Sequence, residues 1–193
     1  DIAVARRLGY EVKLLGIAEC DPHTGEVSVR VHPAMVPVQH PLASVRHSYN
    51  AVFVEGAAVG SLMFYGRGAG GGPTASAVLG DVIDAAVNLT NKTHAPLGTF
   101  AKARILGIAD TSAEYLIGLD VADEPGVLHE VTGAFAAHGV SIRAAEQEGF
   151  ADQARLVFIT HTARESAVQA TVGTLRDLAT VRRVGSLIRV VGS

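Results

Sequence analysis

A run of glycines at residues 66–72 (GRGAGGG) is the first place in this sequence where chemistry could be positioned. Gly66, Gly68 and Gly71 match G-x-G-x-x-G, a pattern that lets a backbone approach a pyrophosphate at a helix N-terminus. That fingerprint also requires a preceding parallel strand and an acidic residue about 20 positions later. The preceding strands have the pattern of antiparallel hairpins, and residues 91–96 (NKTHAP) contain no acidic residue. We therefore reject a Rossmann site. The milder prediction is a loop that a ligand or another segment approaches closely, and the alternative is a tight connection between domains.

A second candidate is the segment Asp123–Leu128 (DEPGVL), which joins a predicted strand to a predicted helix. Gly126 leaves room beside the helix N-terminus, where backbone N–H groups could meet the carboxylate of a ligand. Asp123 could accept a hydrogen bond from a ligand ammonium group. The alternative is an ordinary acidic turn, which the helix dipole favours without any ligand.

Other chemistries have little support. The eight histidines include no H-x-x-x-H pair and have no cysteine partners, so we predict no metal site. Neither G-x-S-x-G nor a P-loop motif is present, and residues 1–112 offer no convergent nucleophile and base. The single cysteine, Cys20, cannot form an internal disulfide, which favours a reducing cytoplasm.

Composition narrows the class of protein further. Hydrophobic residues make up 48% of the 193 residues, enough for a packed core, so intrinsic disorder is excluded. The net charge of -3 argues against a nucleic-acid partner or an anionic membrane surface. No apolar run reaches the roughly 18 residues that a membrane span needs.

Two predicted hairpins precede the glycine run and would position it. They pair residues 11–20 with 26–32, and residues 50–55 with 59–65. In the first hairpin Val27, Val29 and Val31 alternate with polar residues, which predicts that the valines form the buried face. Residues 1–9 have the pattern of the last turns of a helix with no capping run before it, so we expect a missing N-terminal part.

Prolines and the spacing of apolar residues predict the structure of the segments that follow these hairpins. Prolines at 33, 37 and 41 predict an irregular segment after the first hairpin. After the glycine run, apolar residues recur at helical spacing, and Thr74 can serve as the N-cap. This stripe consists of Ala75, Val78, Leu79, Val82, Ile83, Ala86 and Leu89. Polar residues then predict a connection between two domains.

The last 80 residues have a second, compact pattern. Residues 162–165 (TARE) match a capping box, and residues 148–152 separate two predicted strands. The predicted strands are 115–121, 140–147, 154–161 and 186–191. One predicted helix is striped by Val127, Leu128, Val131 and Phe135, and the capping box opens a second, striped by Val168, Val172, Leu175 and Leu178. The order βαββαβ is that of the ferredoxin-like fold. The whole chain is therefore predicted to be α+β, an antiparallel sheet with helices followed by this ferredoxin-like domain.

From Leu14 to Asp81 the sequence resembles homoserine dehydrogenase. The matching text includes KLLGIAE, VSVRVHPAMVP, NAVFVEG and, most specifically, the glycine-rich stretch at residues 65–75. The last 80 residues resemble an ACT domain, through D-x-P-G-V-L at Asp123–Leu128 and VSI at residues 140–142. Together these resemblances cover nearly the whole chain.

The resemblance implies a C-terminal portion of such an enzyme. The implied domains are the end of the catalytic and dimerisation domain (1–95), a linker (96–112) and an ACT regulatory domain (113–193). The family reduces L-aspartate 4-semialdehyde to L-homoserine with NADH or NADPH, and its catalytic lysine and acidic residues match nothing in this chain. Gly70, with Gly68 second, would contact the cofactor. Asp123 and Gly126 would bind an amino-acid effector, threonine above all, in a homodimer or homotetramer.

Two other classes of function stay open at this point. One is an amino-acid-sensing module without catalysis, which would leave the glycine run unexplained. The other is a small complete enzyme with a new site in residues 1–112.

Overall fold

The computed structural model describes residues 1–94, 98, 102–150 and 153–191, and by its contacts the chain divides into two compact units. One unit contains residues 1–38 and 103–193, and the other contains residues 39–102. The division predicted from the sequence, at 1–95, 96–112 and 113–193, follows motifs rather than contacts and stays a prediction. Residues 95–97, 99–101 and 151–152 lie outside the described residues. The prediction that a strand ends at residue 147 is wrong, because residues 148–150 continue the strand Ile142–Phe150.

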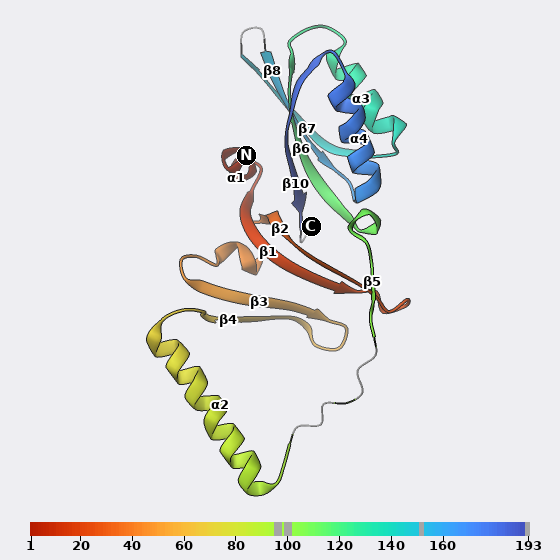
Figure 1. Ribbon diagram of the computed structural model, residues 1–193. Coiled ribbons are helices and arrows are strands. Elements are labelled where there is room, and N and C mark those ends of the chain that lie inside the picture. The colour runs from red at the N-terminus through yellow and green to blue at the C-terminus, as the bar shows by residue number, and fades with distance from the viewer. Residues whose placement is uncertain (95–97, 99–101, 151–152, 192–193) are drawn as a thin grey trace. The chain divides into compact units, whose positions relative to one another are not determined.

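The C-terminal part of the first unit has the predicted ferredoxin-like arrangement. Its elements are β6 (Ser112–Ala122), α3 (Val127–Ala137), β7 (Ile142–Phe150), β8 (Gln153–Thr160), α4 (Glu165–Asp177) and β10 (Val181–Val190). The strands lie in the order β10-β6-β8-β7 and all neighbours in this part are antiparallel. Figure 1 shows α3 and α4 on one face of this sheet. The α+β class predicted from the sequence is confirmed.

A continuous apolar core lies between this sheet and its two helices. Alternate residues of β6 point into it, because side chains of a strand alternate between faces. The rings of Phe135 on α3 and Phe158 on β8 pack at 5.0 Å between centroids. The fully buried large residues are Tyr115, Ile117, Leu119, Phe135, Phe158 and Leu175. This region therefore buries its apolar pattern within the chain.

The predicted first hairpin extends the same sheet. Strands β1 (Tyr10–Cys20) and β2 (Glu26–Pro37) pair antiparallel, and β2 pairs parallel to β10 through Ala34 and Met35. The short strand β5 (Arg104–Ile105) pairs with β2, and α1 (Ile2–Arg7) precedes β1. A second apolar cluster joins these segments to the far face of the ACT-like sheet; it contains Val4, Ala5, Met35, Leu116, Val157 and Val190.

The prediction that β2 ends before its prolines is wrong. The strand continues through Pro33 to Pro37, opposite Leu14 and Tyr10 respectively. The two prolines are four residues apart, so both missing N–H groups face the same edge of the strand. The pairing with β1 therefore runs without interruption from Tyr10 to Pro37.

The predicted valine face of β2 is also wrong within this chain. Val29 and Val31 are 63% and 72% exposed, whereas Ser28 and Arg30 are buried. The two buried polar side chains are satisfied by Glu19 on β1, which accepts from Arg30 NH1 at 2.7 Å and from Ser28 Oγ at 3.2 Å. The alternation of valines with polar residues correctly predicted a strand. The prediction of which face is buried was wrong.

Two predictions at the ends of C-terminal elements need correction. Thr162 does not cap α4; the helix begins at Glu165, whose N–H donates to the carbonyl of Thr111 at 2.9 Å, while Arg164 is the N-cap without a side-chain bond. Strand β10 begins at Val181 rather than at residue 186. A register shift between Val184 and Leu187 breaks its alternation and hides its first half from a periodicity argument.

The second unit contains the other predicted hairpin and the predicted long helix. Strands β3 (Tyr49–Gly56) and β4 (Gly60–Arg67) pair antiparallel, and α2 spans Gly71–Asn91. A short 3-10 helix (Pro41–Ser44) precedes them. The helix starts earlier than predicted, with Gly70 rather than Thr74 as N-cap, because Pro73 is tolerated in a first helical turn. None of the residues of α2 is buried.

Candidate functional site

The glycine loop between β4 and α2 has structural reasons for two of its glycines. A Cβ on Gly68 would lie 1.6 Å from Nδ2 of Asn50, so the Asn50 side chain occupies the space beside this backbone. Gly70 has φ +122 and ψ 145, a conformation that L side chains rarely adopt. The sequence did not indicate a contact between Asn50 and Gly68. The contact depends on the β3–β4 register, which pairs Asn50 with Gly66.

The same loop leaves open backbone at the start of α2. A Cβ on Gly71 or Gly72 would meet no heavy atom within 4 Å. The first turn of this 21-residue helix carries no acidic residue. Open backbone and free N–H groups at a long helix are suited to an anionic group such as a phosphate. The backbone of this loop is therefore compatible with binding the phosphate groups of a nucleotide.

A shallow groove lies next to this loop. It has a volume of about 260 Å³ and is lined by Asn50, Val52, Phe64, Tyr65 and Arg67, among others. Tyr49 and Tyr65 stack at 5.0 Å, and the Arg67 guanidinium lies 5.4 Å from the ring centroid of Tyr49. The groove thus combines aromatic surface with one cation beside Gly68.

The second predicted site, the turn from β6 to α3, brings its two residues together. Gly126 has φ +96 and is the N-cap of α3. Asp123 is exposed, and its Oδ2 lies 3.5 Å from the position of a Cβ on Gly149, which places it beside the end of β7. The Asp123 carboxylate makes no hydrogen bond to the described residues. A free carboxylate and a glycine-opened helix start are thus adjacent.

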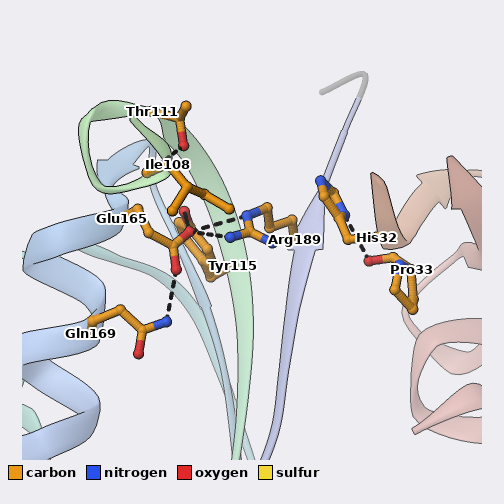
Figure 2. A network of polar contacts seen from close by, with 8 residues as sticks. All are labelled: His32, Pro33, Ile108, Thr111, Tyr115, Glu165, Gln169 and Arg189. Carbon is orange, nitrogen blue, oxygen red and sulfur yellow. Dashed lines mark hydrogen bonds and ion pairs between the residues drawn. The ribbon is translucent and has the colours of Figure 1, made fainter. Parts of the chain in front are cut away.

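A buried polar network at the start of α4 was not foreseen (Figure 2). The Glu165 carboxylate accepts hydrogen bonds from Tyr115 OH at 2.7 Å, from Gln169 Nε2 at 2.7 Å, and from Nε of Arg189 at 3.1 Å. NH2 of Arg189 also donates to it. The only sequence signal was the supposed capping box, which assigned Glu165 a local role instead of this long-range one.

The network fixes two protonation states. Burial by itself raises the pKa of the Glu165 carboxyl, but the hydrogen bonds from Gln169, Tyr115 and Arg189 outweigh it, so the net pKa is lowered. Burial, with the adjacent Glu165 carboxylate, raises the pKa of Tyr115 to about 12. Glu165 is therefore held as an anion and Tyr115 as a neutral donor, which is a structural role rather than acid–base chemistry at neutral pH.

Metal and membrane sites receive no positive support. Among the residues that the structure describes, no group of three or more His, Cys, Asp or Glu side chains could hold a metal ion. In the same part of the chain, no helix has the length and apolar character to cross a membrane.

Comparison with known proteins decides the family. Residues 1–83 match the family model "Homoserine dehydrogenase", and residues 115–180 match the model "ACT domain". The chain is 45% identical over 196 residues to a homoserine dehydrogenase of Corynebacterium glutamicum, which covers 98% of this chain. It is 43% identical over 203 residues to that of Mycobacterium tuberculosis strain H37Rv, which covers 100% of it. The chain belongs to the homoserine dehydrogenase family.

Solved structures agree with this assignment. A homoserine dehydrogenase from Thiobacillus denitrificans matches with a TM-score of 0.89 at 34% identity, over 98% of this chain and 44% of that one. A homoserine dehydrogenase from S. aureus at pH 6.0 matches with a TM-score of 0.66 at 27% identity, over 100% and 45%. The chain spans 44% and 46% of the length of the two relatives named above.

The family assignment gives the two predicted sites different surroundings. The glycine loop and α2 lie within the homoserine dehydrogenase match, apart from the last turns of the helix, and the turn at Asp123–Gly126 lies within the ACT domain. The structure brings Gly68 close to Gly70 in one loop, and Asp123 close to Gly126 in one turn. Their roles in binding stay predictions.

Proposed function

We propose that the complete protein to which this chain belongs reduces L-aspartate 4-semialdehyde to L-homoserine with NADH or NADPH. The observation that carries the proposal is 45% identity to a homoserine dehydrogenase over 98% of the chain. A bound nicotinamide supplies the hydride, which adds to the aldehyde carbon, while a proton adds to the oxygen. This places the protein in the biosynthesis of threonine, methionine and isoleucine, in the cytoplasm.

This chain supplies positioning rather than proton transfer. Residues corresponding to the family's catalytic acid or lysine were not found in the sequence, so no catalytic residue is assigned to it. Gly70 and Gly68 would let the cofactor approach the start of α2, where open backbone at Gly71 and Gly72 favours an anionic group. Loop backbone of this kind orients a cofactor against its substrate.

Steady-state kinetics of the complete protein test both statements. The protein is expected to oxidise NADH or NADPH only when aspartate semialdehyde is added, and absence of turnover would contradict the activity. Gly70→Val should raise the KM for the nucleotide or abolish turnover. Gly80→Ala, in the same helix but away from the loop, is the control, since its Cβ would also meet open space. Equal kinetics for Gly70→Val and the parent would remove the cofactor role of this loop.

The ACT domain is proposed to bind an amino-acid effector, threonine as the end product, at Asp123 and Gly126. Support comes from the exposed Asp123 carboxylate beside a helix start opened by Gly126. A coupling of about 1–3 kcal/mol, or roughly 5–150-fold in affinity, would suffice for feedback control. Threonine should inhibit the complete protein and release heat on binding, and Asp123→Asn should weaken both effects. If threonine produces neither heat nor inhibition, it is excluded as the effector.

We further propose a homodimer or homotetramer. The β1–β2 hairpin leaves an apolar face open, with Leu14 and Val31 each 72% exposed, and β1 is an edge strand of the sheet. Open faces and edges of this kind are often closed by a second copy. Analytical ultracentrifugation of the complete protein should give a dimer or tetramer, and Val31→Glu should shift it towards the monomer.

A further inference from the structure

A polar pocket lies between the β1–β2 hairpin and the ACT-domain sheet, at the end of β6 opposite to the turn at Asp123–Gly126. Its volume is about 180 Å³, and its charged or hydroxyl-bearing lining residues are Glu19, Arg30, Ser112, Glu114, Thr162 and Arg189. All of them belong to one compact unit of the chain. Pockets for drug-sized ligands measure about 300–1,000 Å³, so this one would hold only a small molecule.

Two guanidinium groups in the pocket have donors to spare. The Arg30 side chain is 6% exposed, and its NH1 donates to Glu19 at 2.7 Å and to Ser28 at 2.9 Å. Since a guanidinium carries N–H groups on all three nitrogens, Nε and NH2 of Arg30 are left without a partner among the described residues. Arg189 uses Nε and NH2 for Glu165, which leaves its NH1. A guanidinium N–H that no side chain of the pocket uses can donate to a bound acceptor.

Hydroxyl groups at the rim add further hydrogen-bonding capacity. Ser112 and Thr162 line the pocket, and their side chains make no hydrogen bond to the part of the chain that the structure describes. A hydroxyl can donate or accept, so either can serve a carboxylate or an ammonium group.

The charge balance of the pocket selects the class of ligand. Arg30 is paired with Glu19, Arg189 with Glu165, and Arg143 with Glu114, the last at 2.8 Å. These three pairs leave no net charge, so a phosphate would introduce an uncompensated negative charge beside the largely buried side chains of Arg30, Arg189 and Glu114. A zwitterion adds none. Its carboxylate can accept from the spare donors of Arg30 and Arg189, and its ammonium group can donate to Glu114, whose side chain is only 13% exposed.

We propose that this pocket binds a small α-amino acid as its zwitterion, at a site separate from the turn at Asp123 and Gly126. The inference goes beyond the proposed function, because direct binding to the 193-residue chain tests it whether or not the complete protein is a reductase. Arg30 lies in the homoserine dehydrogenase match and Thr162 in the ACT match. A bound amino acid would therefore connect strand β2 with the start of β6.

Titration of the 15N-labelled chain tests the site directly. The probes are glycine, L-alanine, L-serine, L-threonine and L-homoserine, each followed by amide chemical shifts and by calorimetry. At least one is expected to shift the amides of Ser112, Glu114 and Thr162 together. If none of the five shifts them, the proposal is overturned.

Two analogues of the tightest probe test the need for both charges. Its methyl ester lacks the carboxylate, and its desamino analogue lacks the ammonium group. Both are expected to bind at least tenfold more weakly. If the desamino analogue binds as tightly as the amino acid, the pocket is an anion site only, and the zwitterion proposal is wrong.

Variants locate the binding. Arg30→Gln and Thr162→Val should each weaken binding at least tenfold. Thr90→Val in α2 of the other unit, where the hydroxyl donates to the Ala86 carbonyl, is the matched control that should leave binding unchanged. Thr162→Val keeps the side-chain volume and breaks no ion pair, so it remains informative if Arg30→Gln does not fold. If Asp123→Asn abolishes the shifts and Thr162→Val does not, the amino acid binds at the turn. That result would overturn the pocket and support the effector site under the proposed function.

Discussion

The two compact units of this chain handle the same kind of amphipathic sequence in opposite ways. In α4 of the first unit, the apolar stripe is buried, with Val168 and Leu175 fully enclosed. In α2 of the second unit, the stripe is exposed, with Val78, Leu79 and Ile83 between 56% and 61% accessible. Periodicity alone therefore predicts that a helix forms, but it does not tell whether the partner of its apolar face is in the chain.

This difference determines where each site can be tested. The polar pocket and the turn at Asp123 belong to the unit that buries its own core, so binding to them can be measured on the chain itself. The glycine loop joins β4 and α2, whose apolar residues Phe64 and Leu79 are 64% and 61% exposed. A test of cofactor binding there requires the complete protein.

The largest effect is expected from breaking the buried network of the first unit. Glu165→Ala leaves the charge of Arg189, whose side chain is 17% exposed, without its partner. Removing one member of a buried ion pair costs about 3–5 kcal/mol. Urea unfolding of the chain should show this loss in the transition of the first unit. A loss below 1 kcal/mol would mean that Arg189 finds another acceptor, or that the network is hydrated.

A matched pair of leucines gives the most direct test of the comparison. Leu175 on α4 is completely buried, whereas Leu79 on α2 is 61% exposed. Leu175→Ala should cost about 2–5 kcal/mol, because it removes buried methyl groups and leaves a cavity. Leu79→Ala should stay within about 0.5 kcal/mol, as for most surface substitutions. Equal effects in thermal unfolding would show that α2 is packed in solution and would break the comparison.

Within the second unit the glycine loop should be the sensitive element. Gly70→Ala forces a side chain into φ +122, at a cost of about 1–3 kcal/mol. Gly72→Ala should be neutral or stabilise by up to about 1 kcal/mol, since it is helical and meets no atom within 4 Å. Proteolysis at α2, read by mass spectrometry, should accelerate in Gly70→Ala only. Equal rates in both variants would show that the loop relaxes around position 70.

Local patterns in the sequence predicted most of the fold, and the errors arise where long-range contacts decide. The ferredoxin-like order followed from strand and helix periods, and the family followed from the glycine-rich stretch and D-x-P-G-V-L. By contrast, the buried polar face of β2 has its partner on the neighbouring strand, where Glu19 binds Arg30. The role of Glu165 depends on Tyr115, fifty residues away along the chain. No short-range pattern contains these pairings.

The positions of the predicted site residues were only partly accessible from sequence for the same reason. Gly126 could be identified because a helix N-terminus needs no distant partner. The constraint at Gly68 comes from Asn50, which only the β3–β4 register reveals. The polar pocket was not foreseen at all, since Arg30 and Arg189 come from opposite ends of the chain and meet through the parallel contact of β2 with β10.

The smallest effect is expected from pH, and it sharpens the contrast between the units. The pKa of Glu165 is lowered below 4.5 in the folded state, so its stabilising contribution is fully present above pH 4.5 and is lost as pH falls through the folded pKa. Glu165→Gln lacks this titration. The difference in unfolding free energy between the parent chain and Glu165→Gln should therefore be constant from pH 7 to 5 and shrink from pH 4.5 to 3. A difference that grows on acidification would mean that the folded carboxyl is the better proton acceptor, and burial rather than the three donors would then control Glu165.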